Sequence, residues 1–192
     1  MHIEFLVEEP SAEAALRHLL PRILRPRTTF AIHPHQGKRD LLLKLPSRLR
    51  AYARWLPTDY RLCVLVDEDR QDCRALKSVL RRHARAAGVA ALNRIAIEEI
   101  EAWFFGDIEA VAVAYPGVSP ALGRQAAFRD PDAVRGGTWE ALERELRRRG
   151  HFRTGLRKME AADAIARHMD PERNRSRSFR AFRDGLRALE GG

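Results

Sequence analysis

One stretch of the sequence reads Tyr60-Arg61-Leu62-Cys63-Val64-Leu65-Val66-Asp67-Glu68-Asp69, a nearly continuous apolar run that leads directly into acidic residues. An apolar run of this length and composition predicts a strand that is buried on both faces, as in a parallel sheet. Helices then cover both faces of the sheet and connect one strand to the next. The stretch therefore predicts an α/β fold with acidic residues at the end of a buried strand.

The rest of the first hundred residues alternates in the same way. Short apolar runs at residues 2–7, 28–33 and 93–97 predict three more strands, and the segments between them have helical apolar periodicity. Proline interrupts two of the predicted helices, at Pro21 and Pro46. The pattern predicts an open, mainly parallel sheet of about four strands flanked by helices.

The composition changes after Tyr115. Residues 116–137 are rich in Pro, Gly and Asp and predict loops or short turns, and helical patterns follow. We therefore expect an α/β core over residues 1–115. A helical C-terminal extension, residues 116–192, is expected to pack on that core as one structural unit.

Charge and hydropathy restrict the class of protein. Hydrophobic residues make up 45% of the chain and charged residues 32%, which is ordinary for a globular protein. There is no apolar run of membrane-spanning length and no export signal, so we expect a cytoplasmic protein that does not bind membranes. The net charge of +9, much of it in residues 141–192, favours a polyanionic partner such as nucleic acid. A merely solvated arginine-rich surface would have the same composition.

Acidic residues follow three of the predicted strands. Glu8 comes after the first strand, Asp67 and Asp69 come after the third, and Glu101 comes after the fourth. Strand ends of open α/β sheets are where ligands bind, and Mg²⁺ prefers oxygen ligands. In extended backbone Asp67 and Asp69 would point the same way, so that one ion could contact both. Glu13, one turn into the following helix, is either a further ligand or an acid favoured by the helix dipole.

Phosphate contacts are expected from basic and hydroxyl side chains. Lys38 follows a glycine in a polar turn, and the C-terminal part contains Lys158, Arg175 and Arg177. Ser178 is a further candidate phosphate ligand, or else the cap of the last helix.

The acidic pattern resembles the Toprim domain of topoisomerases, primases and nucleases of the overcoming-lysogenization-defect type. The whole chain looks like a Toprim-like family of small bacterial proteins of unknown function. The stretches that carry the likeness are Val7-Glu8-Glu9-Pro10-Ser11-Ala12-Glu13, Gly37-Lys38-Arg39-Asp40-Leu41-Leu42, Val66-Asp67-Glu68-Asp69, Glu99-Ile100-Glu101-Ala102-Trp103-Phe104-Phe105-Gly106-Asp107 and Asn174-Arg175-Ser176-Arg177-Ser178-Phe179.

The resemblance implies site residues and a function. Glu8, Asp67 and Asp69 match the catalytic metal-binding acids of the Toprim site, and Glu13 and Glu101 match further acids of the Toprim-like variants. The implied activity is a Mg²⁺- or Mn²⁺-dependent nuclease acting on DNA or RNA. Such proteins are often associated with bacterial defence against phages and with a partner ATPase.

One departure from the family pattern keeps an alternative open. The family usually has glycine after the first glutamate, and this chain has Glu9. The alternative is a non-catalytic subunit with a degenerate site that binds nucleic acid or the partner ATPase. Phosphoacceptor receiver domains and haloacid-dehalogenase-like phosphatases fit less well, because they place their acids and lysine differently along the strands.

Overall fold

The computed structural model describes residues 1–191, and its centre is a parallel sheet of four strands. The strands are β1 (His2–Val7), β2 (Thr29–Pro34), β3 (Tyr60–Asp67) and β4 (Ala91–Ala96), in the spatial order β2-β1-β3-β4. All three pairings are parallel, with Val7 opposite Leu65 and Asp67 opposite Ala96. The carboxyl ends of β1 and β3 therefore meet in the middle of the sheet, and the predicted α/β class is confirmed.

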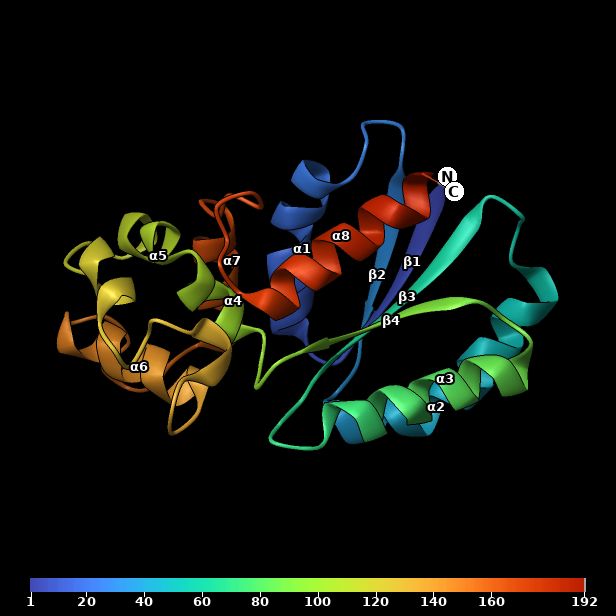
Figure 1. The fold of residues 1–192 in the computed structure, drawn as a ribbon, viewed down its shortest axis with the longest axis horizontal. Coiled ribbons are helices and arrows are strands. Elements are labelled where there is room, and N and C mark those ends of the chain that lie inside the picture. Colours follow the sequence, from blue (N-terminus) through green and yellow to red (C-terminus); the bar gives the residue numbers. More distant parts are fainter. Residues whose placement is uncertain (192) are drawn as a thin grey trace.

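Helices cover both faces of the sheet, as Figure 1 shows. Helices α2 (Lys38–Trp55) and α3 (Cys73–Ala87) pack on one face, where Leu41, Leu45 and Leu80 contact Val64 and its neighbours. Helix α1 (Pro10–Ile23) and the C-terminal helix α8 (Arg177–Gly191) cover the other face. The end of the chain thus supplies one of the four helices that enclose the sheet.

The remaining helices form a group beside α1, at the left of Figure 1. They are α4 (Glu101–Gly106), α5 (Ile108–Ala114), the 3₁₀ turns η1 (Pro120–Arg124) and η2 (Pro131–Ala133), α6 (Thr138–Arg148) and α7 (Lys158–Ala166). Trp103, Phe104 and Phe105 of α4 are fully buried and belong to the same apolar core as α1, α8 and the sheet. This shared core joins the helical group to the sheet.

The sequence placed most of these elements correctly. The interruption predicted at Pro46 is wrong, because α2 runs through that residue and buries Leu41, Leu45 and Leu49 on the sheet. Helix α1 also continues past Pro21, although only to Ile23. None of the helices in residues 1–191 combines the length and apolar character that crossing a membrane would require.

Candidate functional site

The loops that follow β3 and β4 are bonded to each other at the carboxyl edge of the sheet. The backbone N–H of Asp69 donates to the carbonyl of Glu98 at 2.9 Å, and the N–H of Glu68 donates to that of Ala96 at 2.8 Å. Asp69, Arg70 and Glu98 all have left-handed backbone, with φ of 50°, 59° and 58°. Non-glycine residues seldom adopt this conformation, and such strain concentrates at functional sites.

Glu8 and Asp67 form the centre of the edge. Glu8 is only 6% exposed, and its Oε2 accepts a hydrogen bond from the backbone N–H of Asp67 at 3.1 Å. Burial raises the pKa of Glu8 to about 7. Asp67 is partly exposed as a residue, yet desolvation of its carboxyl and then the charge of Glu8 raise its pKa well above the usual range. Two carboxyls are thus held together without an ion pair to either in residues 1–191.

Asp69 lies at the same edge but is turned toward a lysine. Its Oδ2 is 2.8 Å from Nζ of Lys38, which also donates to the carbonyl of Glu68 at 3.1 Å. The prediction that Asp67 and Asp69 share extended backbone is wrong, because β3 ends at Asp67 and Asp69 is left-handed. Asp69 still adds to the negative charge around Asp67.

A second acidic pair borders the centre from the β4 side. Glu101 is 2% exposed, and burial raises its pKa to about 7. Nζ of Lys158 lies 3.4 Å from Glu99 and 4.0 Å from Glu101. Glu99 also accepts from the Thr138 hydroxyl and the Trp139 N–H, whereas Oε2 of Glu101 has no hydrogen-bond partner within the described chain. The sequence indicated the burial of Glu101 through its aromatic neighbours, but nothing local indicated that α6 and α7 reach Glu99.

The arrangement fits a divalent cation bound by few protein ligands. No group of three or more His, Cys, Asp or Glu side chains in residues 1–191 is placed to hold an ion by itself. Glu13, one of the predicted ligands, instead pairs with Arg17 at 2.5 Å. Mg²⁺ commonly takes one or two carboxylates and completes its shell with water and substrate phosphate. Glu8 and Asp67 provide such a pair, and the unpaired oxygen of Glu101 lies on the same edge.

Glu9 does not distort this edge. Its backbone is extended, with φ −137° and ψ 159°, a conformation that any residue adopts. Its Oε2 accepts from the Ser11 hydroxyl at 3.3 Å, at the start of α1. The turn after β1 therefore does not require the glycine that the Toprim pattern would place there.

The residues predicted to bind phosphate divide into two groups. Lys38 and Lys158 lie at the acidic edge, as described above. Ser178 is 6% exposed and bonded to Trp103 and Asp132, so its hydroxyl is occupied inside the fold. Arg175 donates to the carbonyl of Gly123, and Arg177 pairs with Asp130. These three residues bind the start of α8 to the helical group, and none of them forms a hydrogen bond or ion pair with an acid of the edge in residues 1–191.

A family model matches most of the chain. No curated protein and no solved structure matches the chain. Residues 7–187 match the family described as "Domain of unknown function (DUF4276)". That match runs from the last residue of β1 into α8 and so includes the acidic edge and the whole helical group. The chain belongs to the DUF4276 family of domains of unknown function.

Proposed function

We propose that this chain is a Mg²⁺- or Mn²⁺-dependent nuclease of the Toprim type that hydrolyses phosphodiester bonds. The observation that supports this proposal is the enclosed pair Glu8 and Asp67, which has raised pKa values and no ion-paired cation in residues 1–191. Like charges so close together are unfavourable in the absence of protons or a cation. Their position at the carboxyl ends of parallel strands is the usual ligand site of an open α/β sheet.

The side chains at the edge would have two roles, binding of the metal and binding of the phosphate. A divalent cation bound there would supply Lewis-acid activation of water and neutralise the charge that develops on the phosphate. Glu8 and Asp67 would hold the cation through their carboxylate oxygens. Lys38, beside Asp69, and Lys158, beside Glu99, would attract and orient the phosphodiester by charge.

A second candidate function has its own observation. Lys38 already neutralises Asp69, one of the three acids that the Toprim resemblance assigns to the metal. A site that has lost that ligand would suit a non-catalytic subunit that binds nucleic acid or a partner ATPase. A role in bacterial defence belongs to either candidate and follows from the resemblance alone.

The test is cleavage of labelled DNA and RNA with Mg²⁺, Mn²⁺ or a chelator. We expect metal-dependent cleavage by the wild-type chain and none by Asp67→Asn or Glu8→Gln, with folding of both checked by circular dichroism. Glu13→Gln should cleave normally, because Glu13 pairs with Arg17 rather than with the edge. Full activity of Asp67→Asn would exclude the proposed site. Metal binding without cleavage by the wild type would favour the non-catalytic subunit.

A further inference from the structure

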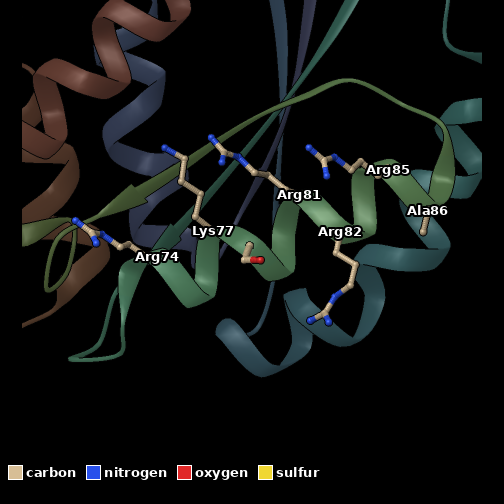
Figure 2. Close-up of a pocket in the computed structure, with 7 residues that line it drawn as sticks. Arg74, Lys77, Arg81, Arg82, Arg85 and Ala86 are labelled. Atoms are coloured by element: carbon tan, nitrogen blue, oxygen red, sulfur yellow. The ribbon is translucent and has the colours of Figure 1, made fainter.

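Helix α3 carries a row of basic side chains. None of them belongs to the acidic edge, and none has a role in the proposed reaction. Its fifteen residues, Cys73–Ala87, contain five Arg or Lys and no Asp or Glu. Four of the basic residues follow helical spacing along one side, and we call them the α3 stripe: Arg74, Lys77, Arg81 and Arg85. In Figure 2 Lys77, Arg81 and Arg85 extend to the same side of the helix, whereas Arg82 points away toward α2.

The α3 stripe is not neutralised by the protein. Arg74, Arg81 and Arg85 are exposed, and none of the four side chains forms an ion pair with any acid in residues 1–191. Half of the arginines in residues 116–191 do have an acidic partner, for example Arg147 with Glu143. Partial burial and the nearby charges of Arg94 and Arg81 lower the pKa of Lys77. The stripe is therefore a concentration of like charge that an external anion would relieve.

The position of the stripe connects it to the acidic edge. Helix α3 begins directly after the loop that carries Asp67 and Asp69, and the carboxylate of Asp72 caps it by accepting from the N–H of Arg74. Since β3 runs toward the edge and α3 runs back along the sheet, Arg74 lies near the edge and Arg85 lies at the far end. A chain of phosphates bound along the stripe would lead to the proposed site.

The geometry points to the phosphate backbone of duplex DNA as the ligand of the α3 stripe. From Arg74 to Arg85 the helix rises about 16 Å, a length that spans roughly five phosphates of one strand in a duplex. The helix contains no Phe, Tyr or Trp on which an unpaired base would stack, as single-strand binders use. The four side chains of the stripe are donors only, so they match the acceptor oxygens of phosphate and provide no acceptor for the 2′-hydroxyl proton that distinguishes RNA.

This inference rests on the proposed function for its substrate class, but the two are tested separately. Binding of labelled duplex DNA is measured by anisotropy in the Asp67→Asn background, where the substrate stays intact. We expect Arg81→Gln with Arg85→Gln to weaken binding at least tenfold at ~50 mM salt. The slope of log K against log salt is negative, and it should become less negative by about 2, because two phosphate contacts are lost.

The control variant loses the same number of positive charges as the stripe variant, but from a different helix. Arg147→Gln with Arg148→Gln removes two exposed arginines from α6, where each is already paired with a glutamate. This pair of substitutions should leave affinity and salt slope within about twofold of the background. Arg74→Gln with Lys77→Gln is a second stripe variant. If the first variant does not fold, the same binding measurement on this second variant tests the inference.

The outcomes separate the two proposals. Equal loss of affinity in the stripe and control variants would overturn the inference, and so would no loss in either stripe variant. In that case the stripe would only guard the β4 edge of the sheet against pairing with another chain. Equal or tighter binding of single-stranded DNA or duplex RNA would overturn the assignment to duplex DNA. Stripe-dependent binding by a wild-type chain that cleaves nothing would support the inference and contradict the nuclease.

Discussion

Two regions of this molecule differ in how they accommodate buried carboxylates. In the helical group Asp107 receives two hydrogen bonds from Arg173, at 2.8 and 3.0 Å, and one from the Asp170 N–H at 2.7 Å. Asp132 accepts from the hydroxyls of Ser176 and Ser178 and from backbone N–H groups at the start of α8. At the sheet edge Glu8 accepts one backbone N–H, and Oε2 of Glu101 accepts none in residues 1–191.

The acids of the helical group stabilise the fold through their hydrogen bonds and ion pairs. The acids of the sheet edge are buried with few donors, and the rest of the fold keeps them in place. A buried charge with a full set of donors is stabilised where it lies, and removal of the charge leaves the donors unpaired. A buried acid without donors is kept in place by the surrounding structure at a cost in stability. Substitutions in the two regions should therefore change stability in opposite directions.

The largest effect is expected at Asp132. Replacement by alanine would leave the hydroxyls of Ser176 and Ser178 and the first N–H groups of α8 without their acceptor. We expect Asp132→Ala to lower the free energy of unfolding by about 3 kcal/mol, measured by urea denaturation. Asp130→Ala, two residues away, removes an exposed ion pair with Arg177 and one hydrogen bond from the Asp132 N–H, so it should cost only about 1 kcal/mol. Similar losses for both variants would mean that Asp132 does not anchor α8.

The next effect has the opposite sign and depends on pH. The pKa of Glu8 is about 7 in the folded protein and 4.5 without the fold, so between these values the folded state binds the extra proton. Without divalent metal, the contribution of Glu8 to the free energy of unfolding is therefore fully present below about pH 4.5 and is lost as the pH rises through 7. At pH 8 we expect Glu8→Gln to unfold with a free energy about 2 kcal/mol higher than that of the wild type.

A metal titration sharpens the same prediction. Mg²⁺ or Mn²⁺ should raise the melting temperature of the wild type at pH 8, because it binds only the folded chain. The same titration should leave Glu8→Gln nearly unchanged. A wild type that is as stable at pH 8 as at pH 5 without metal, and that does not respond to metal, would remove the distinction between the two regions.

The sequence was sufficient for the sheet and for the acids at its edge. Apolar runs predicted four strands, and helices that alternate with strands predicted the parallel direction that puts Glu8 and Asp67 at the same edge of the sheet. The conformation of Asp69 could not be predicted, because its left-handed backbone depends on a hydrogen bond to Glu98 in another loop. Local sequence patterns carry no information on such pairings between distant segments.

The C-terminal part was harder to predict for the same reason. Arg175, Arg177 and Ser178 form a dense basic and hydroxyl segment that favours phosphate binding when it is considered alone. Their partners are Gly123, Asp130 and Asp132, about fifty residues earlier in the chain. The α3 stripe illustrates the converse case, because only the structure shows that its four side chains form no ion pair in residues 1–191.

The smallest effect is expected for Arg177→Gln, which separates the two contributions of that residue. The side chain is 70% exposed and pairs with Asp130, with its Nε also 4.0 Å from Asp132, whereas the backbone N–H donates to Asp132 at 2.5 Å. Glutamine keeps the N–H, so the free energy of unfolding should change by less than about 0.5 kcal/mol. Affinity for duplex DNA should also stay within about twofold of the parent, because Asp130 already neutralises the guanidinium. A loss of affinity as large as that of the α3 stripe variants would contradict this expectation. The DNA-binding surface would then extend to the start of α8, and Arg177 would be a phosphate ligand, as the sequence predicted.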